Sequence, residues 1–309
     1  MIANAHEHLE SPEEFPAYLN IMAKTGVGRV LFVGSGNATI YQSKPHGFDG
    51  YHERNLALLK GLKRYGDVVS VFPALNPLDP DNLDRLERYL DLGAAGIKLY
   101  HGLASSHFKG PWHTVALDDI RMAPIFEQCR ELDLPVIFHV NRVSFYEEML
   151  RLLEAQPGLK VCFPHFMVSS KNRHRLRRVA AVLDRYPNVY TDCSGGREDH
   201  LLPFCGSMTR RPDQFRIFFR RYSRRIMWGT DLVITKVKMA TMVPYVESMV
   251  RWYRNIVEQR SYTTPEFAGA KEMRGMGLSG STLANVYSET FLRFIRSKVY
   301  QPSLSKREI

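Results

Sequence analysis

The chain has 309 residues, of which 44% are hydrophobic and 24% are charged. This is the composition of an ordinary globular protein with a large core, which excludes a disordered or low-complexity chain. The sequence does not begin like a signal peptide, and no stretch is apolar over the ~18–20 residues that a membrane-spanning helix needs. The four cysteines show no CxxC spacing, as expected of reduced thiols. We therefore expect a cytoplasmic protein with no membrane partner.

The formal net charge is +10, with 42 Lys and Arg against 32 Asp and Glu. Much of this excess lies in arginine-rich stretches at 171–178 and 210–225. Such stretches occur in nucleic-acid-binding proteins, but also on solvated helix faces. No nucleic-acid-binding motif accompanies them here. We expect solvated faces that attract anionic substrates mildly, and no nucleic-acid partner; whether the chain forms a homo-oligomer stays open.

Eight short apolar runs, rich in β-branched and aromatic residues, follow one another along the chain. They span 2–9, 29–35, 68–75, 95–100, 135–140, 160–166, 188–194 and 225–231. Most are continuously apolar rather than alternating, which is typical of parallel strands buried on both faces.

Helical patterns separate these runs. They span 12–26, 53–66, 82–93, 120–133, 145–158, 174–187 and 212–223. Strands that alternate with helices predict a parallel sheet, and eight such units indicate an α/β fold closed into a parallel, eight-stranded (β/α)8 TIM barrel. An open doubly wound sheet is the alternative. Because such barrels typically need about 250 residues, we expect a single domain over 1–309, closed by a final helix at 282–300.

Ionisable side chains stand where several of these runs end. Six of them end five runs: His6 and His8, then Lys98, His139, His165 and Asp231. In a parallel barrel all strand ends meet at one mouth. Strand alternation puts both histidines of the H-x-H motif on one side, and it predicts that Phe163 shares the inner side with His165. So many buried ionisable groups are costly unless something pairs with them, and imidazole with carboxylate suits zinc or a similar divalent metal.

Three further residues follow strand ends at the predicted mouth, where they could bind substrate: Tyr100, His101 and Arg142. An arginine in such a place can hold a carboxylate or phosphate through two hydrogen bonds. A plain surface position is the alternative for Arg142.

Several stretches together resemble the amidohydrolase superfamily, and within it the amidohydrolase-related branch (amidohydrolase 2) that includes metal-dependent hydrolases, decarboxylases, lactonases and hydratases. They are NAHEHL (4–9), AAGIKLY (94–100), LPVIFHV (134–140), FPHF (163–166), YPNVYTDCSG (186–195) and RIMWGTD (225–231), with NVYSETFLRF (285–294) similar to the closing helix of the family. The resemblance runs through nearly the whole chain, but no motif specifies the substrate.

The resemblance implies roles for these residues. His6 and His8 would bind a buried divalent metal, with zinc as the first expectation, and Asp231 would be a further ligand that also takes a proton from the attacking water. His139 would be a ligand in one-metal members, where His165 orients or deprotonates the water. Metal lowers the pKa of bound water toward ~7, which would supply hydroxide at neutral pH.

In two-metal members of the superfamily, His139 and His165 hold the second ion, and a carbamylated lysine bridges the pair. Lys98 occupies the place of that lysine. An unmodified Lys98 that pairs with a substrate carboxylate or a nearby acid is the other interpretation. We expect one ion rather than two.

We therefore expect a metal-dependent hydrolase that uses metal-activated water to cleave a C–N or C–O bond of a small, anionic molecule. A non-hydrolytic decarboxylase or hydratase of the same branch is the alternative, although the aromatic decarboxylases of the family often carry Glu where His6 stands. A metal-dependent nuclease is less expected, because those relatives typically carry Glu where Lys98 stands. The complete set of polar residues argues against a non-catalytic binding barrel.

Overall fold

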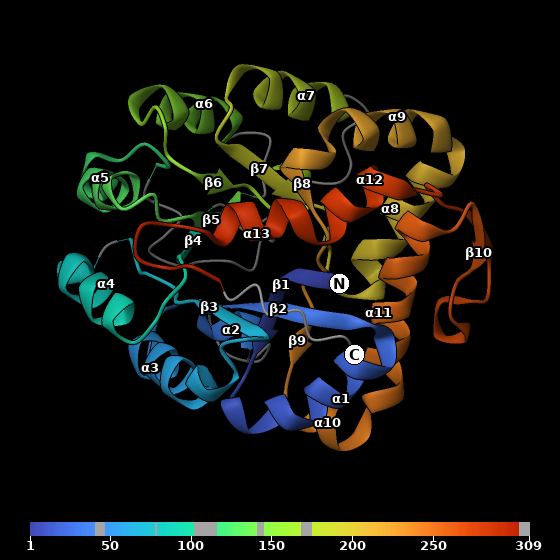
Figure 1. Cartoon of the computed structure of the whole chain (residues 1–309), viewed down its shortest axis with the longest axis horizontal. Coiled ribbons are helices and arrows are strands. Elements are labelled where there is room, and N and C mark those ends of the chain that lie inside the picture. The colour runs from blue at the N-terminus through green and yellow to red at the C-terminus, as the bar shows by residue number, and fades with distance from the viewer. Residues whose placement is uncertain (41–46, 78, 102–115, 141–144, 168–174, 303–309) are drawn as a thin grey trace.

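The computed structural model describes residues 1–40, 47–77, 79–101, 116–140, 145–167 and 175–302 (Figure 1). The strands are β1 (Ile2–Leu9), β2 (Val27–Val33), β3 (Val69–Phe72), β4 (Ile97–His101), β5 (Val136–Val140), β6 (Val161–Cys162), β7 (Val189–Asp192), β8 (Ile226–Met227), β9 (Val233–Ile234), β10 (Ser261–Thr263) and β11 (Glu272–Arg274).

The α-helices are α1 (Phe15–Thr25), α2 (Asn37–Ile40), α3 (Tyr51–Leu62), α4 (Asn82–Asp91), α5 (Ala123–Glu131), α6 (Tyr146–Ala155), α7 (Arg175–Arg185), α8 (Glu198–Arg210), α9 (Pro212–Tyr222), α10 (Lys236–Thr241), α11 (Val243–Glu258), α12 (Gly280–Ala284) and α13 (Thr290–Ile295). A π-helical turn, η9 (Asn285–Glu289), joins the last two, and a short 3-10 turn, η6 (His165–Met167), follows β6.

The strands form a ring of parallel neighbours. One sheet has the order β3-β2-β1-β9 and another the order β4-β5-β6-β7-β8, and every pair within them is parallel. Backbone hydrogen bonds join the two sheets at both edges: Lys98 donates to Pro73 O (2.9 Å) and Ala5 donates to Trp228 O (2.9 Å). The predicted (β/α)8 TIM barrel is thereby confirmed, and the open-sheet alternative is wrong.

Two sets of apolar side chains fill the barrel and surround it. The larger set lies between the strands and the outer helices. The smaller set fills the barrel at the end where the strands begin, and it consists of Ala3, Ala5, Leu31, Val33, Phe72, Ala95, Ile137, Cys162 and Met227, with Phe291, Phe294 and Ile295 of α13. Figure 1 shows α13 lying across this end of the ring, so the predicted closing helix covers the floor of the barrel.

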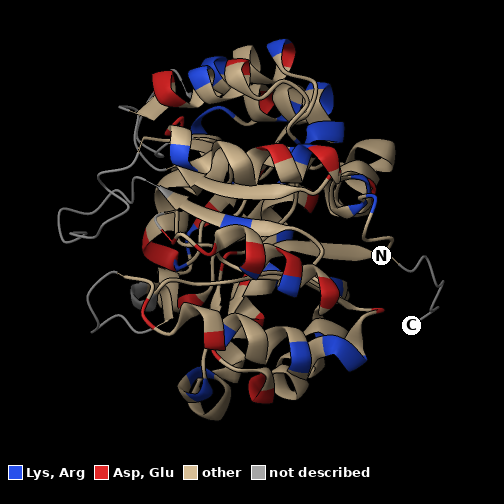
Figure 2. Cartoon of the chain, turned by 90° about the vertical axis from the view of Figure 1, so that its left-hand side faces the viewer, with Lys and Arg blue, Asp and Glu red and all other residues tan. Residues whose placement is uncertain are grey.

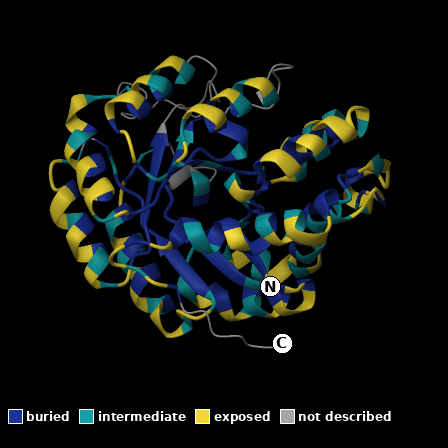
Figure 3. Ribbon diagram, turned by 45° about the horizontal axis from the view of Figure 1, so that its top comes forward, coloured by how far each residue is buried: buried dark blue, intermediate teal, exposed yellow. Residues whose placement is uncertain are grey.

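Burial follows these layers. The strands of the barrel are almost entirely buried, whereas the β10–β11 hairpin is largely exposed, and the outer helices expose one face each (Figure 3). Lys, Arg, Asp and Glu lie mostly on the outer helices, where Arg221 pairs with Asp184 and Arg185 with Glu154 (Figure 2). None of the helices in the described residues has the length and apolar character needed to cross a bilayer. That the whole chain forms one domain stays a prediction.

The structure corrects several predicted elements. The sixth and eighth strands are only two residues long, because the chain leaves the ladder soon after Cys162 and Met227. Helices α8 and α11 and the antiparallel β10–β11 hairpin were not predicted. The last helical segment begins at Gly280 and ends at Ile295, so it starts and stops earlier than expected.

Candidate metal centre

A β-bulge in β1 turns both histidines of the H-x-H motif into the barrel mouth. Asn4 pairs with Val30 and Glu7 with Phe32, so three steps along β1 face only two along β2. Such an extra residue breaks strict alternation. Ala3 and Ala5 face the interior below the bulge, and His6 and His8 face it above. The side chain of Glu7 points to the opposite side of the strand, where Tyr18 of α1 binds it.

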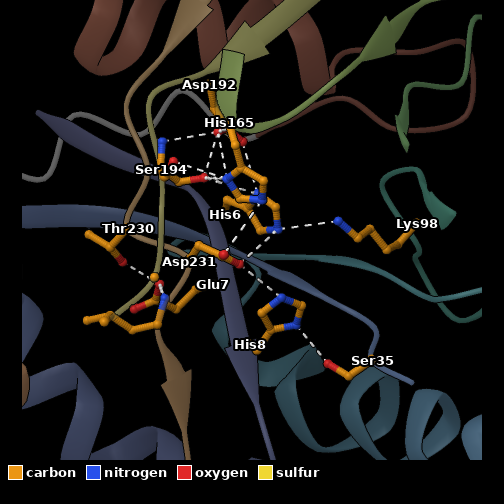
Figure 4. A network of polar contacts seen from close by, with 12 residues as sticks. His6, Glu7, His8, Ser35, Lys98, His165, Asp192, Ser194, Thr230 and Asp231 are labelled. Carbon is orange, nitrogen blue, oxygen red and sulfur yellow. Dashed lines mark hydrogen bonds and ion pairs between the residues drawn. The ribbon is translucent and has the colours of Figure 1, made fainter. Parts of the chain in front are cut away.

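The orientation of His6 is fixed by a buried carboxylate. Its Nδ1 lies 2.9 Å from Oδ2 of Asp192, and both side chains are fully buried (Figure 4). Because a carboxylate can only accept, Nδ1 must donate, which leaves Nε2 of His6 as an acceptor. His8 is held in a similar way, since its Nδ1 lies 2.7 Å from the hydroxyl of Ser35.

Asp231 brings a carboxylate to these two rings. Its Oδ1 lies 3.3 Å from Nε2 of His6 and 3.1 Å from Nε2 of His8. The Asp231 backbone has a φ of +61°, a conformation that residues other than glycine rarely adopt and that costs energy. Close approach at this point also requires Gly229, because a Cβ there would lie 3.2 Å from Cβ of His6.

These donor atoms fit a divalent cation. His6, His8 and Asp231 offer three ligand atoms within 4.8 Å of one another. Burial lowers the pKa of His6 to about 4 and lowers the pKa of His8, so both rings stay neutral near pH 7 as metal ligands must. Burial alone would raise the pKa of Asp231, but the neighbouring imidazoles outweigh it and hold that pKa well below its usual range. The ionised carboxylate oxygen of Asp231 and Nε2 of His6, 3.3 Å apart, are both acceptors, and a cation between them would satisfy both.

His165 reaches the same mouth by a route that strand alternation did not predict. The strand ends at Cys162, and the backbone of His165 has a φ of +55° in the turn that follows. Phe163 packs on the helix side of the strands, with Phe138, so the prediction that it shares a side with His165 is wrong. The His165 ring nevertheless stacks at 5.2 Å on that of His6, measured between ring centroids.

The hydrogen bonds of His165 define which ring nitrogen faces the site. Nδ1 lies 3.0 Å from the carbonyl oxygen of Ser194 and 2.9 Å from its hydroxyl. A carbonyl can only accept, so Nδ1 donates and Nε2 is left as a proton acceptor. This Nε2 lies 3.6 Å from Oδ2 of Asp231 (Figure 4). His165 and Asp231 thus present two proton-accepting groups to one space.

Lys98, His139 and Tyr100 lie beside this cluster. Nζ of the fully buried Lys98 is 3.3 Å from Nε2 of His6 and 4.8 Å from the centroid of the Tyr100 ring. Burial lowers the pKa of Lys98 to about 8. The His139 ring lies between those of His165 (4.9 Å) and Tyr100 (6.1 Å), measured between centroids, and burial lowers its pKa as well. The Tyr100 hydroxyl donates to the carbonyl of Gly34 (2.6 Å), so it is the ring that faces the site.

Two predicted substrate-binding residues cannot be placed here. Arg142 lies outside the described residues. His101 is the last residue of β4, at the mouth, but its side chain is not among those described.

Sequence reasoning missed Asp192, Ser194 and Ser35. Asp192 accepts hydrogen bonds from His6, from the hydroxyl and amide of Ser194 (2.6 and 3.1 Å) and from the amide of His165 (2.9 Å), so one carboxylate organises two histidines. Asp192 could have been found from the sequence, because it lies near the end of the seventh apolar run, where the same reasoning identified Lys98 and His139. Ser35 likewise follows the second strand, but a serine in a turn carries no comparable signal.

Comparison with known proteins gives the family. The model of the family described as Amidohydrolase matches residues 6–254, which include every residue of this cluster. No curated protein matches the sequence.

Solved structures share the fold at low sequence identity. A proposed 2-pyrone-4,6-dicarboxylic acid hydrolase from Pseudomonas putida is 15% identical, with a TM-score of 0.62 over 95% of this chain and 97% of that one. A 2,6-dihydroxybenzoate decarboxylase from Rhizobium is 17% identical, with a TM-score of 0.57 over 95% and 98%. An uncharacterised TIM-barrel protein from Bordetella bronchiseptica is 14% identical, with a TM-score of 0.61 over 95% and 98%. These likenesses establish the fold, and the match to the family model over most of the sequence shows that the chain belongs to the amidohydrolase family.

Proposed function

We propose that this protein is a metal-dependent hydrolase that uses water to cleave a C–N or C–O bond of a small, anionic molecule, in the cytoplasm and without a nucleic-acid partner. One observation carries the proposal: three ligand atoms of His6, His8 and Asp231 lie within 4.8 Å of one another at the barrel mouth. The buried Asp192 behind His6 supports it, since metal-bound histidines usually donate their second ring nitrogen to such a carboxylate.

A divalent ion bound by these three residues, with zinc the first candidate and one ion expected, would polarise a water molecule or a substrate oxygen. The protein supplies the proton acceptors. Nε2 of His165 and Oδ2 of Asp231 lie 3.6 Å apart, so a water molecule between them is within reach of both. The Ser194 carbonyl keeps the proton of His165 on Nδ1, which leaves Nε2 ready to accept one.

The preference for an anionic substrate rests on Lys98. Its ammonium is buried beside His6 and contacts the face of the Tyr100 ring. Burial lowers the pKa of Lys98 to about 8, and the ionised carboxylates of Asp231 and Asp192 keep it from falling further. An unmodified Lys98 could pair with a substrate carboxylate while the Tyr100 ring packs against the substrate body. Arg142 is proposed as a second anion-binding residue, and His101 as a further contact.

A decarboxylase of the same family is the second candidate. The family match does not separate the two reactions, and a decarboxylase is among the proteins that share the fold. Hydrolysis adds one water across the cleaved bond, whereas decarboxylation releases CO2 and replaces the carboxylate with a proton.

The test combines metal counting with isotope labelling. Protein stripped of metal and reloaded separately with Zn²⁺, Mn²⁺ and Co²⁺ is analysed for metal per chain and assayed with lactones, amides and aromatic carboxylates in H₂¹⁸O. We expect one ion per chain and ¹⁸O in one product. The matched control is His200→Ala, which removes an exposed histidine of α8 and should change nothing. CO2 release without ¹⁸O incorporation would favour the decarboxylase, and the lack of any stoichiometric metal would contradict the proposal.

A further inference from the structure

We propose that Asn4 and Glu7, on the outer face of β1, form a clamp that holds the segment carrying Asp231 in its ligating conformation, so that both are positioning residues. This inference rests on the proposed metal-dependent function, because it assigns to the clamp a part in metal affinity.

The segment between β8 and β9 is not part of a regular strand, and its backbone amides are bound by residues of β1 instead. Three consecutive amides of this segment donate to β1. The amide of Thr230 donates to Oδ1 of Asn4 (3.1 Å), that of Asp231 to the carbonyl of His6 (2.7 Å), and that of Leu232 to Oε2 of Glu7 (2.9 Å). Two of these three acceptors are side chains. The residues on either side of Asp231 are therefore fixed by Asn4 and Glu7.

The clamp is fully buried and its described polar atoms are paired. Oε2 of Glu7 also accepts from the Thr230 hydroxyl (Figure 4). Oε1 accepts from the hydroxyl of Tyr18 on α1 (2.6 Å). The amide nitrogen of Asn4 donates to the Thr230 hydroxyl oxygen (3.0 Å). Asn4, Glu7, Tyr18 and Thr230 each have 0% exposed surface. Loss of the Glu7 side chain would leave the buried Leu232 amide and the hydroxyl groups of Thr230 and Tyr18 without this acceptor, which is costly in a buried network.

The strained backbone of Asp231 explains why a clamp is needed. A residue at a φ of +61° returns to a more favourable conformation unless its surroundings prevent it. Such a change would move Oδ1 away from the 3.1–3.3 Å contacts with the two histidines. The bulge in β1 turns the histidines inward and Glu7 outward. The single strand β1 thus carries two proposed ligands on its inner face and the support of the third on its outer face.

Zn²⁺ affinity distinguishes a clamp from a merely structural network. We would measure the affinity of the full-length, metal-stripped protein by competition with a chelator, together with the visible spectrum of the Co²⁺ form, which reports coordination geometry. Glu7→Ala is expected to weaken Zn²⁺ binding by about 10–100-fold, the range seen when partners of metal ligands are removed, and to change the Co²⁺ spectrum. Glu7→Gln keeps an oxygen for Thr230 and Leu232 and is expected to restore the affinity to within about threefold of wild type.

Thr290→Val is the matched control, because it removes a buried hydrogen bond, to the carbonyl of Ser223 (2.9 Å), that involves neither the clamp nor the segment of Asp231. It should lower the melting temperature but leave Zn²⁺ affinity unchanged. If Glu7→Ala does not fold, Thr230→Val removes the two hydrogen bonds that the Thr230 hydroxyl makes with Glu7 and Asn4, and should weaken Zn²⁺ binding by about three- to tenfold. If Glu7→Ala, or Thr230→Val where Glu7→Ala does not fold, binds Zn²⁺ as tightly as wild type, the inference is overturned and the proposed function is unaffected. A wild-type protein that binds no Zn²⁺ would overturn the proposed function itself.

Discussion

The two ends of the barrel are built from the same strands but have opposite chemistry. At the floor, Ala3 and Ala5 of β1 pack with Phe294 and other apolar side chains of α13. At the mouth, only one residue further along β1, His6 begins a cluster of ionisable groups. Burial of apolar surface stabilises the fold at the floor, whereas burial of charge at the mouth costs stability. The comparison indicates that fold and chemistry can be altered separately.

The largest effect is expected from removing a ligand at the mouth. Asp231→Ala should abolish Zn²⁺ binding and turnover, because one of three ligand atoms is lost. The free energy of unfolding of the metal-free protein should change by less than about 1 kcal/mol, since the variant also removes a buried charge. Metal analysis and chemical denaturation measure the two quantities. A variant that keeps its metal but is much less stable than wild type would contradict the proposed separation of chemistry at the mouth from stability at the floor.

His165→Ala tests the division of labour within the mouth. If one ion is bound, the variant should keep it and lose about 10²–10⁴-fold in turnover, the usual contribution of a positioned acid–base group. If two ions are bound, the variant should lose the second, and Lys98 should be carbamylated. Counting metal per chain in wild type and variant, with mass spectrometry of Lys98, separates the two outcomes. Unchanged turnover would remove His165 from the proposed mechanism.

Phe294→Ala tests the floor. The side chain is fully buried and its ring lies 6.1 Å from that of Phe72 and 5.1 Å from that of Tyr190. Truncation should lower the free energy of unfolding by about 3–5 kcal/mol, as for other buried phenylalanines. Zn²⁺ affinity of the folded protein should not change. Ile217→Ala is the control, because Ile217 is 66% exposed and its loss should cost less than about 0.5 kcal/mol.

The sequence predicted the fold and most of the cluster because strand patterning and burial decide them. In β4 and β5, regular alternation places Lys98 and His139 at the mouth, since their neighbours Ile97, Leu99 and Phe138 face the helices. The buried face of α11 also follows helical spacing, so this helix was predictable in principle.

Local backbone geometry limited the rest. The inward turn of His6 next to inward Ala5 depends on a bulge, and the direction of His165 depends on a residue with positive φ. Neither follows from the order of polar and apolar residues, because the first is set by the register between β1 and β2 and the second by the turn after β6. The role of Glu7 was hidden for the same reason: a charged residue between two histidines gives no sign that it faces a buried tyrosine on the far side of the strand.

The smallest effect concerns the pH dependence of stability at the mouth. His6 has a pKa of about 4 in the native protein and 6.5 as its reference value. Between these values the unfolded chain binds a proton that the native protein does not, so the stability of the metal-free protein should fall as pH decreases from 6.5 to 4, by up to about 3 kcal/mol. Glu7 acts in the opposite sense, because its native pKa of about 8 lies above its reference value of 4.5, and its contribution to stability falls as pH rises over that range.

The pH dependence of wild-type stability alone therefore mixes two opposing slopes. Subtracting the curve of His6→Ala, measured by chemical denaturation from pH 4 to pH 8, isolates the histidine. A difference curve that is flat between pH 4 and 6.5 would show that His6 is not held neutral by burial, and the readiness of its ring to bind a metal would then need another explanation.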